Sequence, residues 1–105
     1  MQNKKKIKIF QKNYNRPISC LTAYSSSFAS IMDGIVDIVL VGDSLGTVLY
    51  GMKNTQGVTL DLMKLHGLAV RKNLKKSLMI IDMPHKTYNT KKNAYKNSRE
   101  LLNYT

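Results

Sequence analysis

The segment that most constrains the fold is Asp37-Ile38-Val39-Leu40-Val41-Gly42-Asp43, a β-branched apolar run that begins and ends in a carboxylate. Unbroken apolarity of this kind is typical of a strand buried on both faces, and such strands belong to parallel sheets. The run therefore predicts a parallel strand and, with it, an α/β fold.

A strand and a helix are predicted before this run. Residues 18–24 have the composition of a strand, and the serines at 25–27 offer hydroxyls that cap a short helix. Gly34 is the predicted stop of that helix. Its predicted buried stripe consists of Phe28, Ile31 and Met32.

A helix is also predicted after the apolar run at residues 37–43. A loop punctuated by glycines leads to Thr59, where a helix is predicted to begin, and that helix ends near Arg71 and Lys72, which suit the negative end of its dipole. The glycines are Gly46, Gly51 and Gly57, and the residues at helical spacing are Leu62, Leu65, Ala69 and Val70.

A third unit completes the pattern. Residues 78–82 predict a strand that Met83-Pro84 ends, and a polar loop then runs through Tyr88. Asn89 or Thr90 caps the last predicted helix, whose apolar residues are Ala94, Leu101 and Leu102.

Three strand-then-helix units predict right-handed crossovers and one parallel sheet. Three parallel strands leave two open edges, so the chain is either a small three-layer domain or the N-terminal part of a (β/α)8 TIM barrel. The end at Tyr104-Thr105, without a closing element, favours the barrel. Residues 17–105 are the predicted barrel portion. Residues 1–16 are a basic leader in which Ile7, Ile9 and Phe10 form a short amphipathic element over the open end of the sheet.

The net charge of +11, from 17 Lys and Arg against 6 Asp and Glu, raises the possibility of nucleic-acid binding. The cations fall in predicted turns and solvent-facing segments, which favours a solvated surface. They are Lys4, Lys5, Lys6 and Lys8, then Arg71, Lys72, Lys75 and Lys76, then Lys86, Lys91, Lys92, Lys96 and Arg99. A basic stand-alone binding module stays as an alternative.

The single cysteine, Cys20, cannot form an internal disulfide and is predicted to be buried in the first strand. No apolar run approaches the ~20 residues that cross a bilayer, and the basic start lacks the continuous apolar core of a secretory signal. A soluble, cytoplasmic protein is expected.

Two carboxylates occupy the positions where parallel α/β folds gather their chemistry. Asp43 and Asp82 each follow an apolar strand, and the carboxyl ends of such strands meet at one edge of the sheet. Oxygen ligands of this kind suit Mg²⁺, which keeps several waters and leaves room for a substrate. The alternative is that each aspartate caps the turn that follows it.

Ser44 begins a Ser-Leu-Gly turn whose N–H groups and hydroxyl suit a substrate carboxylate, and Gly42 and Gly46 allow close backbone approach. His66 lies on the apolar face of the second helix, where a packed, hydrogen-bonded histidine is expected rather than a ligand. His85 follows Pro84 near a strand end and has no assigned role. Neither zinc spacing nor a Ser-His-Asp arrangement is present.

Several blocks together resemble one family, ketopantoate hydroxymethyltransferase, over residues from about 18 to the end. The blocks are Leu21-Thr22-Ala23-Tyr24, Val39-Leu40-Val41-Gly42-Asp43-Ser44-Leu45-Gly46, Val58-Thr59, Met63, His66, Ala69-Val70-Arg71, Asp82-Met83-Pro84 and Tyr88. Their order and spacing agree with the family. Departures occur at Ser25 and Ser26, at Gln56-Gly57 and at His85.

This resemblance implies a (β/α)8 barrel that transfers a hydroxymethyl group from 5,10-methylenetetrahydrofolate to 3-methyl-2-oxobutanoate, giving 2-dehydropantoate for pantothenate synthesis. It implies that Asp43 and Asp82 bind Mg²⁺ and that Asp43, Ser44 and Asp82 border the 2-oxo acid. The family's further metal carboxylate, its lysine and its glutamate base are expected beyond residue 105, so this chain would carry part of a site. A homo-oligomer is expected at full length.

A third class of protein fits the same strand-end carboxylates. Barrel enzymes of the isocitrate lyase and phosphoenolpyruvate mutase group also act on 2-oxo acids through Mg²⁺. Only the transferase requires folate-dependent product from 3-methyl-2-oxobutanoate.

Overall fold

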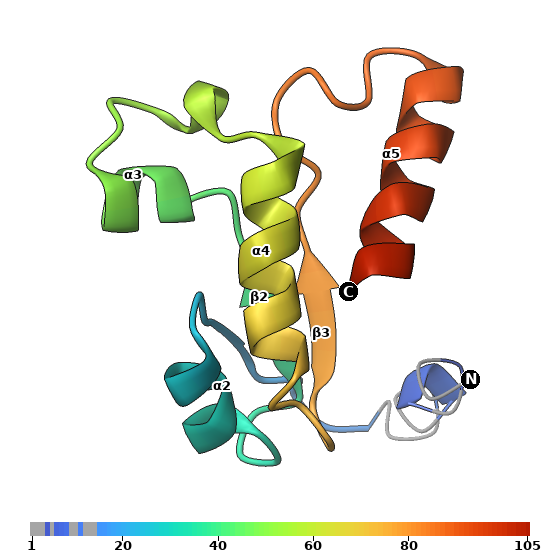
Figure 1. Ribbon diagram of the computed structural model, residues 1–105. Helices are drawn as coiled ribbons and strands as arrows, with labels where there is room; N and C mark the ends of the chain where they lie inside the picture. The colour runs from blue at the N-terminus through green and yellow to red at the C-terminus, as the bar shows by residue number, and fades with distance from the viewer. Residues whose placement is uncertain (1–3, 5, 9–10, 12–14) are drawn as a thin grey trace.

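A computed structural model describes residues 4, 6–8, 11 and 15–105, and its centre is a three-stranded parallel sheet (Figure 1). The strands are β1 (Cys20–Thr22), β2 (Ile38–Val41) and β3 (Leu78–Ile81), paired in the order β1-β2-β3. The predicted α/β class with three parallel strands is confirmed. The apolar run supplies the middle strand, which pairs on both sides.

Helices connect and follow the strands. They are α2 (Ser26–Met32), α3 (Leu45–Tyr50), the 3₁₀ turn η1 (Thr55–Gly57), α4 (Leu60–Arg71) and α5 (Lys91–Tyr104). The hydroxyls of Ser25, Thr59 and Thr90 each accept a hydrogen bond from the backbone N–H three residues later. Thr59 is the predicted start of its helix, and the structure selects Ser25 among the three serines and Thr90 over Asn89. Side-chain capping therefore fixes where these three helices begin.

The glycine-rich segment after β2 is not the plain loop that was predicted. It contains α3 and η1, and Gly51 ends α3 in the left-handed conformation, with φ of 64°. The prediction was wrong because Gly46, Thr47 and Val48 are poor intrinsic helix formers. Packing on the rest of the fold outweighs this weak local preference.

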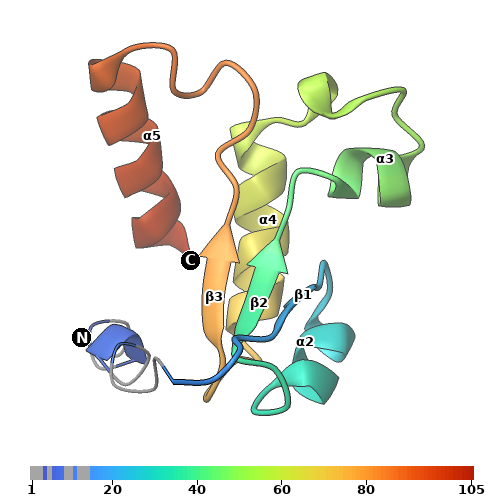
Figure 2. The ribbon, with the colours of Figure 1, turned by 180° about the vertical axis from the view of Figure 1, so that it is seen from behind.

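The sheet is covered on one face only, within the described residues. α4 crosses that face (Figure 1), and the view from behind shows the strands without a helix across them (Figure 2). Val39 and Val41 are fully buried under the helices, whereas Ile80 on the opposite face is 43% exposed. The predicted burial of β2 on both faces is met on one face only, because Ile38 and Leu40 on the other face are half-buried.

Cys20 is exposed because it lies on the edge strand β1 and on the uncovered face of the sheet. All three residues of β1 are exposed, and Cys20 is exposed with them, against the prediction that it is buried. β1 pairs only with β2, so its outer edge is open in the described structure.

The helices of the first and last units turn a different side to the core than predicted. In α2, Phe28 is 60% exposed and Ile31 is 66% exposed, while Ala29 is fully buried and Met32 is partly buried. In α5, Leu101 is buried but Leu102 is exposed. Apolar spacing predicted the helices, and the neighbouring elements decided which side is buried.

In α4 the buried stripe is Met63, Gly67 and Val70, with Leu65 exposed. Gly67 lies where α4 approaches the sheet most closely. A Cβ atom built on it would be 2.5 Å from Cδ1 of Ile81 in β3 and 2.9 Å from Cγ2 of Thr105. The missing side chain lets the helix pack directly on the strand.

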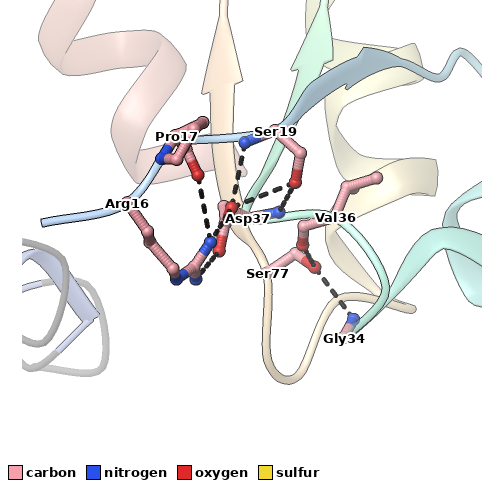
Figure 3. A network of polar contacts seen from close by, with 7 residues as sticks. All are labelled: Arg16, Pro17, Ser19, Gly34, Val36, Asp37 and Ser77. Carbon is pink, nitrogen blue, oxygen red and sulfur yellow. Dashed lines mark hydrogen bonds and ion pairs between the residues drawn. The ribbon is translucent and has the colours of Figure 1, made fainter. Parts of the chain in front are cut away.

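A polar network ties together the amino ends of the strands (Figure 3). Asp37, just before β2, pairs with the Arg16 guanidinium and accepts hydrogen bonds from the N–H (2.9 Å) and O–H (3.0 Å) of Ser19. The N–H of Asp37 donates back to the Ser19 hydroxyl. Arg16, followed by Ser19, holds the pKa of the Asp37 carboxyl well below its usual range.

Ser77 joins β3 to the same end of the sheet. Its hydroxyl donates to the carbonyl of Val36 at 2.6 Å and accepts from the N–H of Gly34 at 2.9 Å (Figure 3). Partial burial opposes ionisation of Asp33, but N–H donors from Ser77 and Lys76 hold the pKa of its carboxyl below the usual value. The turns before β2 and β3 are thus joined.

The leader meets this end of the molecule through Lys6, whose ammonium donates to the Ser77 carbonyl at 2.9 Å. Ile7 is 45% exposed, so it covers little. The predicted contributions of Ile9 and Phe10 fall outside the described residues.

We predict that Gly67→Ala destabilises the chain. The new methyl group meets Ile81, and overpacking of this kind costs about 1–3 kcal/mol, more than the gain of up to about 1 kcal/mol in helix propensity. Urea unfolding measures the change. Gly57→Ala is the matched control, because its Cβ would lie in ordinary contact 3.4 Å from Sδ of Met52. Equal stability of the two variants would contradict the close packing of α4 on β3.

We predict that Asp37 makes stability depend on pH in the acid range. Because its folded pKa is depressed, its contribution is present in full above the unfolded pKa of about 4 and is lost progressively as pH falls from there through the lower folded pKa. Asp37→Asn should therefore be less stable than wild type at pH 7, with the difference shrinking below about pH 5. Asp61→Asn, at an 89% exposed side chain, is the control and should leave the contribution of Asp37 in place.

Candidate active site

The carboxyl ends of β2 and β3 lie side by side, and both predicted aspartates follow them. Val41 pairs with Ile81, and the ladder extends one step further, because the N–H of Asp82 donates to the carbonyl of Val41 at 3.0 Å. Asp82 thus comes directly off β3. Asp43 stands two residues past the end of β2, in the turn that leads into α3.

The two aspartates meet through a hydrogen bond between strands. The N–H of Asp43 donates to Oδ2 of Asp82 at 3.0 Å, and both residues are half-buried. The Asp82 carboxylate therefore supports the turn that carries Asp43, instead of only capping the turn after its own strand. The structure places the Asp82 carboxylate against the backbone of Asp43, at the edge where the sequence predicts both residues.

Gly42 makes room for the polar groups around it. A Cβ atom at this position would lie 3.2 Å from the hydroxyl of Ser44 and 3.4 Å from Oδ2 of Asp82. The Ser44 hydroxyl and the Asp82 carboxylate therefore flank the same glycine. Gly46 differs from the prediction, because its Cβ would meet Cγ2 of Val58 at 2.5 Å, so its small size serves packing.

Ser44 is held by Tyr24, a residue that the sequence placed at the end of the first strand without a role. The two hydroxyls share a hydrogen bond of 2.6 Å, and both residues are half-buried. The Ser44 side chain makes no capping bond to α3, although the residue precedes that helix. The signal for Tyr24 was its location, since it too follows a parallel strand at the carboxyl edge.

His66 of α4 lies behind Tyr24 and has a partner at each ring nitrogen. Nδ1 is 2.8 Å from the carbonyl oxygen of Tyr24, and Nε2 is 2.8 Å from the hydroxyl of Tyr50 in α3. A carbonyl can only accept, so Nδ1 carries a hydrogen, and in the neutral ring Nε2 accepts from Tyr50. The prediction of a packed, hydrogen-bonded histidine is confirmed.

The donor set at this edge consists of oxygens. Asp43, Asp82 and the Ser44 hydroxyl are available, and the described residues contain no group of three or more His, Cys, Asp or Glu side chains placed to hold a metal. His85 is exposed in the turn after Pro84. Two carboxylates with open positions suit a cation that retains water or substrate oxygens.

The helices of the described chain include none with the length and apolarity of a membrane span.

Comparison with known proteins identifies the family. The model for ketopantoate hydroxymethyltransferase matches residues 4–105. The chain is 48% identical over 103 residues to the 3-methyl-2-oxobutanoate hydroxymethyltransferase of Pelagibacter ubique, covering 98% of this chain and 40% of that protein.

Two further relatives carry the same name. The protein of Anaplasma marginale is 49% identical over 84% of this chain and 32% of its own length, and that of Rhizobium etli is 47% identical over 86% and 33%. The chain therefore spans between about a third and two fifths of the length of these relatives. Because the family model matches residues 4–105, the chain belongs to the ketopantoate hydroxymethyltransferase family.

Proposed function

We propose that this chain supplies part of the active site of an enzyme that transfers a hydroxymethyl group from 5,10-methylenetetrahydrofolate to 3-methyl-2-oxobutanoate, giving 2-dehydropantoate. Membership of the family supports the type of reaction. The observation that carries the site is the bond from the Asp43 N–H to the Asp82 carboxylate, which holds the two acidic residues at one edge of the sheet.

The residues at this edge fit a magnesium ion. Asp43 and Asp82 are hard oxygen donors that follow adjacent strands, and Gly42 leaves open the space beside Asp82 that a Cβ would fill. We propose that both carboxylates hold Mg²⁺. When bound, the ion would draw electrons from the keto group of the substrate and so acidify the neighbouring C3–H.

The chain's own groups would orient the 2-oxo acid. The Ser44 hydroxyl can donate to an oxygen of the substrate, because its partner Tyr24 is itself able to donate. The Asp82 carboxylate keeps the Asp43 turn in place through the backbone N–H. Binding and orientation are thus the contributions of this part of the protein.

The rest of the site is expected in the part of the full-length relatives that this chain does not cover. The described residues contain no group of three or more His, Cys, Asp or Glu side chains that could hold a metal, so the family's further carboxylate, its lysine and its glutamate base are expected beyond residue 105. We propose that such residues complete the site in a closed (β/α)8 barrel, whose added strands would cover the bare face seen in Figure 2. A cytoplasmic homo-oligomer is the proposed setting.

A chimera tests the proposal. This chain replaces the matched segment of the Pelagibacter ubique relative, and folate-dependent formation of 2-dehydropantoate is measured. Wild-type chimera should be active. Asp43→Ala and Asp82→Ala should each lower kcat/KM more than about a hundredfold, because loss of partners outside the ligand set already costs about 10–100-fold at metal sites.

Asp61→Ala in the same chimera is the control, since this aspartate is exposed on α4, and it should retain activity. A folded chimera that makes no product from 3-methyl-2-oxobutanoate but acts on another 2-oxo acid would assign the chain to a different barrel enzyme.

Magnesium titration of the chimera distinguishes two roles of Asp82, the negative charge that would bind Mg²⁺ and the acceptance of the hydrogen bond from Asp43. Asp82→Asn retains an oxygen that can accept the Asp43 N–H but lacks the negative charge. We predict that it unfolds like wild type and binds Mg²⁺ at least about tenfold more weakly, as measured by calorimetry. Wild-type affinity in Asp82→Asn would mean that Asp82 serves only as a hydrogen-bond acceptor.

A further inference from the structure

A chain of hydrogen bonds reaches Ser44 from the middle of α4. The Tyr50 hydroxyl contacts Nε2 of His66, Nδ1 of His66 contacts the Tyr24 carbonyl, and the Tyr24 hydroxyl contacts the Ser44 hydroxyl. These residues come from α3, from α4 and from the segments after β1 and β2. Three separate parts of the carboxyl edge are therefore linked through one imidazole ring.

The position of the His66 ring is fixed by the packing of α4. Its neighbour on α4, Gly67, lies where the helix packs directly on β3, and Met63 is fully buried one turn earlier. Tyr24 is fixed from the other side, because the N–H of Ala23 donates to the Leu40 carbonyl at 3.1 Å. The bond from His66 thus holds Tyr24 between the sheet and the helix.

We propose that Tyr24 and His66 are positioning residues that orient the Ser44 hydroxyl as a donor to the anionic 2-oxo acid, an inference that rests on the function proposed above. A hydroxyl has one hydrogen to donate. When the Tyr24 hydroxyl donates to Oγ of Ser44, the hydrogen of Ser44 is left for the substrate. His66 acts one step back, because it fixes the backbone from which Tyr24 reaches Ser44.

The arrangement makes this orientation selective for one substrate. The contact between Tyr24 and Ser44 is half-buried, so water competes less for the two hydroxyls than at an open surface. Ser44 borders the proposed site of the 2-oxo acid, which carries acceptor oxygens. Loss of the Tyr24 hydroxyl should therefore weaken binding of this substrate and leave the folate co-substrate unaffected.

The first test compares tyrosine variants in the chimera. Tyr24→Phe should raise the KM for 3-methyl-2-oxobutanoate about three- to tenfold, the effect of one lost hydrogen bond, with an unchanged KM for 5,10-methylenetetrahydrofolate. Tyr95→Phe is the matched control, because Tyr95 is exposed on α5 and its hydroxyl accepts a hydrogen bond from Arg99, away from the proposed site. Unchanged kinetics in Tyr24→Phe, or equal changes for both substrates with lower stability, would overturn the proposal.

The second test uses rescue at His66. An asparagine amide can take the place of Nδ1–H as a donor, whereas alanine cannot. His66→Ala should reproduce the KM change of Tyr24→Phe, and His66→Asn should restore most of the wild-type value. Tyr50→Phe should have the smaller effect, because it leaves the bond to Tyr24 intact. Equal defects in His66→Ala and His66→Asn would refute the role of His66.

Failure of the transferase proposal can be distinguished from failure of the positioning role. A folded wild-type chimera that makes no 2-dehydropantoate would refute the transferase proposal. Binding of 3-methyl-2-oxobutanoate by calorimetry then tests the positioning role alone. Weaker binding in Tyr24→Phe than in Tyr95→Phe would support that role, and equal binding or absence of binding in both would refute it.

Discussion

Parallel pairing of β2 with both of its neighbours is the constraint on which the rest of the structure depends. Because all three strands run in one direction, their carboxyl ends share an edge, and residues far apart in the sequence meet there. Asp43 and Asp82 are separated in the chain by two helices, a 3₁₀ turn and the strand β3, yet the backbone of Asp43 donates to the side chain of Asp82. Register brings this about, since Val41 lies opposite Ile81.

The two carboxylates that bound the apolar run serve opposite ends of the sheet. Asp37, at the amino end, is neutralised by Arg16 and bonded to Ser19, so its charge is used to join β1 and β2 (Figure 3). Asp43, at the carboxyl end, has no arginine partner among the described residues, and its neighbours are Asp82 and Ser44. This separation agrees with parallel α/β folds in general, where the amino ends stabilise and the carboxyl ends carry chemistry.

Helix α4 packs on the sheet and also contacts the residues around Ser44. Gly67 lets the helix lie against β3, and this close contact sets the position of His66 on the same helix. Through its two ring nitrogens His66 contacts α3 and the segment after β1, which together surround Ser44. A series of direct contacts therefore connects the packing of this helix with the hydroxyl proposed to meet the substrate.

The sequence by itself determined the class of fold, the three parallel strands, the helix start at Thr59, and the location of Asp43, Ser44 and Asp82 just after the strands, because these depend on local pattern and chain direction. Only the tertiary structure decided which helix sides are buried, that Cys20 is exposed, and that α3 forms, since these depend on which neighbours are present. Tyr24 joined the site for the same reason: hydrogen bonds to His66 and Ser44, both distant in sequence, give this tyrosine its position.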